Sequence, residues 1–98
     1  MAPRELPFGT ILIADDNEET LELLTRLLHA HGYRVLVASD GNKALDILMH
    51  QPVDLALLDV LMPGQSGLTV CRAAKGRPET RLTPIVLVTG GDGARRRN

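Results

Sequence analysis

Acidic side chains at the ends of two short apolar runs are the residues of this sequence best suited to chemistry. Asp15 and Asp16 come directly after residues 10–14, and Asp59 comes directly after residues 55–58. Carboxylate oxygens are the ligands that Mg²⁺ prefers, and a site for this ion uses one or two of them together with water. If the two runs are neighbouring strands, these three acids form part of a shell for a divalent cation.

The elements that must bring these side chains together are strands and helices in alternation. Runs that are apolar at nearly every position are typical of strands buried on both faces of a parallel sheet. The pattern predicts strands over residues 10–14, 33–37, 53–58 and 85–88, and helices that begin near residues 18, 43 and 66–67. Parallel strands of this kind bind ligands beyond their carboxyl ends, where Thr89 would add a hydroxyl to the acids. The sequence therefore predicts a doubly wound α/β fold that forms one domain over residues 1–98.

The spacing of apolar residues also predicts which side chains point into the core. The first helix is expected to bury Leu21, Leu24, Leu27 and Leu28, with Leu23 widening its apolar face. The third helix is expected to bury Leu68, Val70, Cys71 and Ala74. The strand over residues 85–88 is apolar throughout, which predicts cover on both faces and a neighbouring strand on each side. We expect the chain to be a truncated domain that compensates by self-association through this strand.

Composition and charge exclude several functional classes. With 98 residues, 44% of them hydrophobic and 23% charged, the sequence fits one ordinary globular domain. A net charge of −1 and an aromatic content of 2% argue against nucleic-acid binding, and we assign the Arg95–Arg97 run to solvent. There is neither a run of about 20 apolar residues nor a signal-peptide pattern, so we expect no membrane partner and a cytoplasmic location. The single cysteine, Cys71, fits a reducing compartment.

Two alternative interpretations of the polar residues were weighed. Asp15 and Asp16 precede a predicted helix, so each could act as a helix cap without any further role. The loop Gly90-Gly-Asp-Gly93 is glycine-rich, but it lacks the lysine and Ser/Thr of a phosphate-binding P-loop.

Three segments, taken together, resemble the receiver domain of bacterial two-component response regulators. They are Ile11-Leu-Ile-Ala-Asp-Asp-Asn-Glu-Glu19, Val53-Asp-Leu-Ala-Leu-Leu-Asp-Val-Leu-Met-Pro-Gly-Gln-Ser-Gly67 and Pro84-Ile-Val-Leu-Val-Thr89. Each segment alone is a weak signal, whereas their joint occurrence in this order at predicted strand ends is specific. The stretch Leu68-Thr-Val-Cys-Arg72 also resembles receivers that are joined to signalling output domains, including those of diguanylate cyclases.

The resemblance implies a CheY-like, flavodoxin-like sheet with strand order 2-1-3-4, the family's fifth strand and last helix being absent from this sequence. It implies that Asp59 accepts a phosphoryl group and that Thr89 engages this group. It also implies that Asp15, Asp16 and Asp59, together with the backbone carbonyl of Leu61, bind Mg²⁺. The lysine that the family carries on its fifth strand has no counterpart in this sequence.

The leading functional hypothesis is a phosphoacceptor module rather than an enzyme, capable at most of its own phosphorylation and dephosphorylation. Its expected partners are a sensor histidine kinase or a small phosphodonor, and an output domain or protein. One alternative is a protein-interaction module of the same fold that is not phosphorylated. Another is a phosphohydrolase, but that class usually carries a second acid two residues after the nucleophile, where this chain has Leu61. We hypothesise that Leu61 instead slows attack by water on the phosphoryl group.

Overall fold

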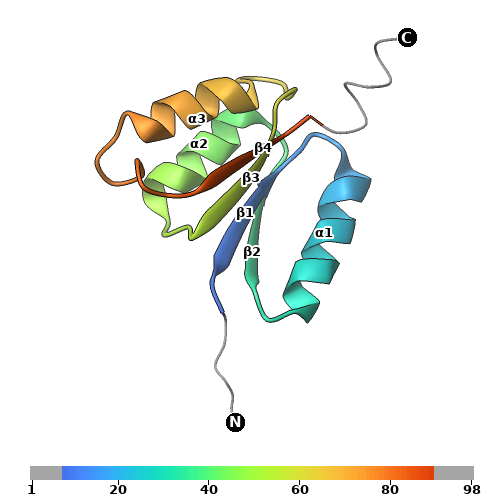
Figure 1. Ribbon diagram of the computed structural model, residues 1–98. Helices are drawn as coiled ribbons and strands as arrows, with labels where there is room; N and C mark the ends of the chain where they lie inside the picture. Colours follow the sequence, from blue (N-terminus) through green and yellow to red (C-terminus); the bar gives the residue numbers. More distant parts are fainter. Residues whose placement is uncertain (1–7, 90–98) are drawn as a thin grey trace.

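The computed structural model describes residues 8–89, which form a parallel sheet with helices on both faces (Figure 1). The strands are β1 (Thr10–Ala14), β2 (Arg34–Ala38), β3 (Leu55–Asp59) and β4 (Ile85–Val88). The helices are α1 (Glu18–Ala30), α2 (Gly41–His50) and α3 (Gly67–Lys75). The strand order is β2-β1-β3-β4 and all pairs are parallel, which confirms the predicted fold class and strand order.

Two apolar layers, one on each face of the sheet, make up the core. On one face, α2 and α3 cover a cluster that includes Leu12, Leu58 and Val70, all with an exposed fraction of 0%. On the other face, α1 covers a smaller cluster built around Ile11, Ile13 and Leu21. Neighbouring residues of a strand point to opposite faces, so β1 contributes to both layers. Residues 11–14 of the central strand β1 are therefore buried on both faces of the sheet.

Each helix begins at a polar residue whose side chain accepts a backbone hydrogen bond three residues later. These N-cap residues are Asn17, Asp40 and Ser66, which accept from the N–H groups of Thr20, Lys43 and Thr69. Such a side-chain bond satisfies one of the otherwise unpaired donors of the first helical turn. Because Asp40 provides this cap, α2 begins two residues earlier than the sequence pattern predicted.

Two predicted strand boundaries differ from the structure. The second strand runs over Arg34–Ala38 rather than residues 33–37, and the third over Leu55–Asp59 rather than residues 53–58. Directly before β3, the side chain of Asp54 accepts a hydrogen bond of 2.7 Å from the backbone N–H of Thr10, and its own N–H donates one of 2.8 Å to the carbonyl of Thr10. The third strand ends on Asp59 itself, so this acid belongs to the sheet.

The predicted inward positions are partly wrong. Leu21 is buried, but Leu23 and Leu27 are 67% and 52% exposed. Leu23 lies beside Glu19, Glu22 and Arg26 on the solvent side of α1, and α1 packs mainly over β1 and β2. In α3, Val70 and Ala74 are buried whereas Leu68 is 48% exposed, since this short helix buries a single narrow stripe.

The expectation that β4 is covered on both faces is also wrong for residues 8–89. Ile85 and Leu87 pack partly into the core, whereas Val86 and Val88 are 47% and 42% exposed. The reason is that α3 packs against this strand on one face, and no described element covers the other. β4 is the last strand in the sheet order, so it has a neighbouring strand on one side only within the described residues. The prediction that the family's fifth strand and last helix are absent concerns residues outside the described range. Within this range, no helix is long and apolar enough to cross a membrane.

Candidate functional site

Three carboxylates meet at the carboxyl-terminal edge of the two central strands. Asp15 and Asp16 directly follow β1, and Asp59 is the last residue of β3. The register pairs Ala14 with Leu58, so the acids follow neighbouring positions of paired strands. One oxygen from each carboxylate lies within 4.8 Å of one oxygen of each of the others. The prediction that these acids converge is therefore confirmed.

The backbone fixes two of the three carboxylates. Asp59 is 7% exposed, and its Oδ1 accepts a hydrogen bond of 3.2 Å from the N–H of Leu61. Asp15 is half-buried, and its Oδ1 accepts a 2.9 Å bond from the N–H of Asn17. Asp16 is exposed. Solvent exposure thus increases from Asp59 through Asp15 to Asp16, so the cluster is open to solvent on the side of Asp16.

The donor set fits a small hard cation. Mg²⁺ binds oxygen at about 2.1 Å in octahedral geometry, so adjacent oxygens lie about 3.0 Å apart and opposite oxygens about 4.2 Å apart. Oxygens that are within 4.8 Å of one another need to move by less than about 1 Å to reach that geometry. Three carboxylates in one place also repel one another, and a divalent cation removes this repulsion.

The other predicted site residues lie beside this cluster. Leu61 is two residues beyond Asp59 and donates its backbone N–H to that carboxylate, while its side chain is 45% exposed. Thr89 is an exposed residue directly after Val88, which is the register partner of Asp59. Its role as the hydroxyl that engages a phosphoryl group stays a prediction.

Sequence reasoning missed a set of contacts that hold the loop between β3 and α3. The backbone N–H of Gly41, at the start of α2, donates a 3.0 Å bond to the carbonyl of Pro63. A Cβ on Gly41 would overlap the carbonyl group of Gln65, so only glycine allows this approach. Asn42 accepts a 2.7 Å bond from the side-chain amide of Gln65. The sequence signal was a glycine shortly before the expected start of the second helix, which does not identify a partner 22 to 24 positions away.

Gly67 holds the other end of the same loop. Its N–H donates a 2.9 Å bond to the carbonyl of Val60. A Cβ at this position would lie 3.0 Å from the carbonyl carbon of Asp59 and 3.1 Å from Cα of Val60. The first turn of α3 is therefore packed directly against the backbone of the buried acid.

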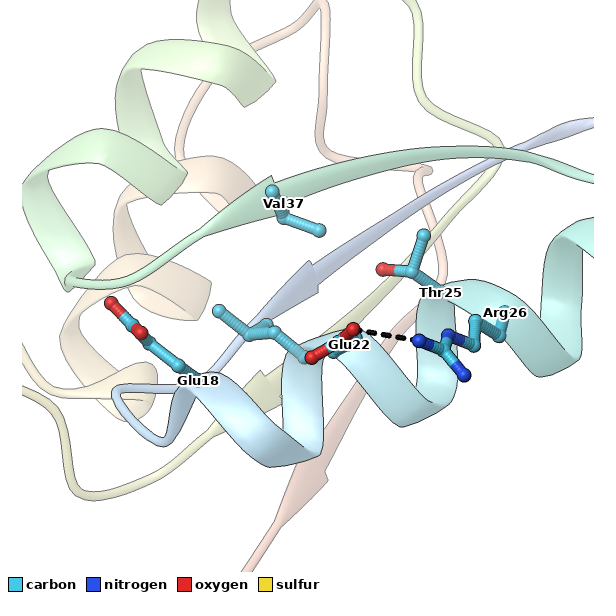
Figure 2. A pocket seen from close by; sticks show the side chains of 6 residues that line it. Glu18, Glu22, Thr25, Arg26 and Val37 are labelled. Atoms are coloured by element: carbon cyan, nitrogen blue, oxygen red, sulfur yellow. Dashed lines mark hydrogen bonds and ion pairs between the residues drawn. The ribbon is translucent and has the colours of Figure 1, made fainter.

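A separate groove of about 300 Å³ lies between α1 and the edge strand β2 (Figure 2). It is lined by Glu18, Leu21, Glu22, Thr25, Arg26 and Val37. Glu22 and Arg26 form an ion pair of 2.9 Å on its rim. The groove contains none of the three clustered acids and is not part of the candidate metal site.

Comparison with known proteins gives consistent matches to one family. The family model described as the response regulator receiver domain matches residues 11–97. The chain is 47% identical over 83 residues to the response regulator PleD of Caulobacter vibrioides. The aligned region covers 85% of this chain and 18% of PleD. It is 42% identical over 79 residues to the transcriptional regulatory protein CpxR of Escherichia coli, covering 81% of this chain and 32% of CpxR. The chain thus spans less than a third of these relatives.

Solved structures give the same result. The N-terminal domain of a response regulator receiver protein from Methanoculleus marisnigri matches with a TM-score of 0.80 and 32% identity, covering 86% of this chain and 68% of that one. The receiver domain of the sensor histidine kinase PA1611 from Pseudomonas aeruginosa, whose crystal structure has a magnesium ion coordinated in its active-site cleft, matches with a TM-score of 0.81 and 28% identity, covering 90% and 74%. With the family model extending over most of the sequence and the same sheet present in the structure, this chain belongs to the response regulator receiver domain family.

Proposed function

We propose that the chain is a magnesium-dependent phosphoacceptor domain of a two-component signalling system, with Asp59 as the residue that is phosphorylated. The observation that carries the proposal is the convergence of the Asp15, Asp16 and Asp59 carboxylates to within 4.8 Å. The magnesium ion in the PA1611 receiver domain supports the choice of metal.

The chemistry required is transfer of a phosphoryl group to a carboxylate, both of which are negatively charged. Bound Mg²⁺ supplies charge neutralisation at this step. Asp15 and Asp16 would hold the ion together with Asp59 and the backbone carbonyl of Leu61. One oxygen of Asp59 attacks phosphorus, the bond from phosphorus to the donor breaks, and an acyl phosphate forms. The backbone bond from Leu61 to Asp59 orients the carboxylate for this attack.

The test is incubation of the 98-residue chain with Mg²⁺ and acetyl phosphate or phosphoramidate, followed by intact mass measurement. We expect the mass to increase by one phosphoryl group. The increase should be lost in Asp59→Asn and on chelation of Mg²⁺. Asp46→Asn is the matched control, because Asp46 is an exposed acid whose ion pair with His50 lies on α2. An increase that persists in Asp59→Asn would overturn the assignment of the phosphorylated residue.

A second candidate function is a receiver-fold interaction module that is not phosphorylated. The observation that favours it is the number of large apolar side chains that are exposed, among them Leu82 at 84% and Leu23 at 67%. This function predicts Mg²⁺ binding with no increase in mass. A phosphohydrolase would instead turn over an external phosphate ester, and Leu61 stands where that class needs its second acid.

The partners follow from the phosphoacceptor role. A sensor histidine kinase is the proposed phosphodonor in the cytoplasm, and an output domain or protein responds to the phosphorylated state. Thr89 is proposed to contact the phosphoryl group, since it follows the register partner of Asp59. Self-association through β4 is a further proposal, because Val86 and Val88 expose an apolar surface on this strand.

A further inference from the structure

The turn that joins β2 to α2, residues 38–42, supplies none of the clustered carboxylates but contacts the backbone on both sides of them. On one side, the N–H of Asp15 donates a bond of 3.1 Å to the carbonyl of Ala38. Ala38 is 1% exposed and is the register partner of Ala14, the last residue of β1. One end of the turn is therefore fixed in the sheet, directly beside the first pair of acids.

The other end of this turn contacts the loop between β3 and α3. The N–H of Gly41 donates a 3.0 Å bond to the carbonyl of Pro63, and the side-chain amide of Gln65 donates a 2.7 Å bond to Oδ1 of Asn42. A Cβ on Gly64 would lie 2.8 Å from Nδ2 of Asn42, so the Asn42 side chain lies directly against the loop backbone. The start of α2 thus holds three consecutive residues of the loop.

This loop carries the part of the proposed metal site that is not a carboxylate. Its first residues include Leu61, whose N–H bonds to Asp59 and whose carbonyl is the proposed fourth protein ligand. The end of the loop is fixed at Gly67, which bonds to Val60. Between these two points, the bonds to the turn restrain the loop. The conformation of the Leu61 carbonyl therefore depends on contacts made by residues that do not touch the ion.

We propose that Asn42 is a positioning residue of the metal site, which acts through Gln65 to hold the loop in the conformation that presents the Leu61 carbonyl to Mg²⁺. The inference rests on the magnesium site of the proposed function, but it does not require phosphorylation of Asp59. If the loop is in the binding conformation only part of the time, the apparent Kd rises by the inverse of that fraction. The Asn42–Gln65 bond lies at the surface, so its loss should shift the loop without unfolding the chain.

The test is the Kd for Mg²⁺, measured by isothermal titration calorimetry at physiological ionic strength. Asn42→Ala and Gln65→Ala should each raise it about 2- to 10-fold, which is the range that one hydrogen bond can contribute. The double variant should bind no more weakly than either single variant, because both remove the same bond. Arg26→Ala is the matched control, since it removes an exposed side-chain bond of 2.9 Å on α1 and should leave the Kd unchanged.

A conservative variant separates the hydrogen bond from the side chain as such. Asn42→Asp keeps an oxygen that accepts from Gln65, so most of the affinity should be retained. Its added charge also attracts Mg²⁺, and the same substitution in the Gln65→Ala background measures this contribution without the bond. Asn42→Asp should therefore improve binding more when Gln65 is present than when it is absent. Equal effects in the two backgrounds would contradict the positioning role.

A purely structural bond is distinguished by linkage between the bond and the ion. The coupling between Asn42 and Gln65, from a double-mutant cycle of unfolding free energies, should be larger with saturating Mg²⁺ than without it. Reciprocity requires the increase to match the change in Kd. A bond that only stabilises the fold would give the same coupling in both conditions.

The outcomes separate this inference from the proposed function. An unchanged Kd in Asn42→Ala and Gln65→Ala, in a chain that is still phosphorylated, would overturn the positioning role alone. A raised Kd in both variants, in a chain that gains no phosphoryl mass, would overturn the phosphoacceptor function and leave the positioning role supported. A chain that binds no Mg²⁺ would overturn both.

Discussion

Gly67 offers a direct test of how the first turn of α3 holds the buried acid. An alanine at this position would place its Cβ 3.1 Å from Cα of Val60 and 3.0 Å from the carbonyl carbon of Asp59, and closer still to the Asp59 carbonyl oxygen. These atoms belong to the backbone, so no rotation of a side chain can relieve the overlap. Either the start of α3 or the end of β3 must move.

The expected magnitude follows from two opposing effects. Alanine in a helix is favoured over glycine by up to about 1 kcal/mol. Overpacking against atoms that cannot move aside costs about 1–3 kcal/mol, and here the overlap is with backbone, which places the cost in the upper part of that range. We expect Gly67→Ala to lower the free energy of unfolding by about 1–2 kcal/mol, or the melting temperature by about 4–16 °C for a domain of this size.

The assay is thermal unfolding followed by circular dichroism, with and without Mg²⁺. The stabilisation by saturating amounts of Mg²⁺ reports its affinity, because binding to the folded state adds RT ln(1 + [Mg²⁺]/Kd). This stabilisation should shrink in Gly67→Ala, since the backbone of Asp59 is displaced. Gly76→Ala is the matched control: its Cβ would have no neighbour closer than 3.6 Å, and φ is −84°. A Gly67→Ala variant as stable as the unmodified chain would refute this account.

Three further substitutions test the core, the turn before β4 and the site. Leu12→Ala should reduce the free energy of unfolding, measured by denaturant titration, by about 3–5 kcal/mol because the side chain is fully buried. Leu82→Ala is the control: Leu82 is 84% exposed, so its replacement should change the same quantity by less than about 0.5 kcal/mol. Thr80→Val should cost about 1–2 kcal/mol, since the Thr80 hydroxyl donates a buried 2.6 Å bond to the carbonyl of Ala74; Thr80→Ser should recover most of it in the same titration. Leu61→Asn should speed loss of the phosphoryl group by admitting a polar group and water beside Asp59, as measured by the decay of the phosphorylated mass; an unchanged decay rate would contradict a protective role for Leu61.

Much of the fold could be predicted because its signals are local. Apolar runs identified all four strands. The cap of α1 is Asn17 rather than Asp15 or Asp16. The meeting of Asp15 and Asp16 with Asp59 was also predictable, because parallel strands end at the same edge of the sheet. The sequence alone therefore determined the order of elements and the identity of the acidic cluster.

Only the tertiary structure decided which apolar residues are buried. Leu27 has the spacing of a core residue, yet it is more than half exposed, because α1 packs mainly over β1 and β2. Val86 is likewise exposed for lack of a described element above it. The contact of Gly41 with the loop after β3 also depends on residues that are distant in sequence. Periodicity tells which side of an element is apolar, but what lies against that side depends on how the whole chain packs.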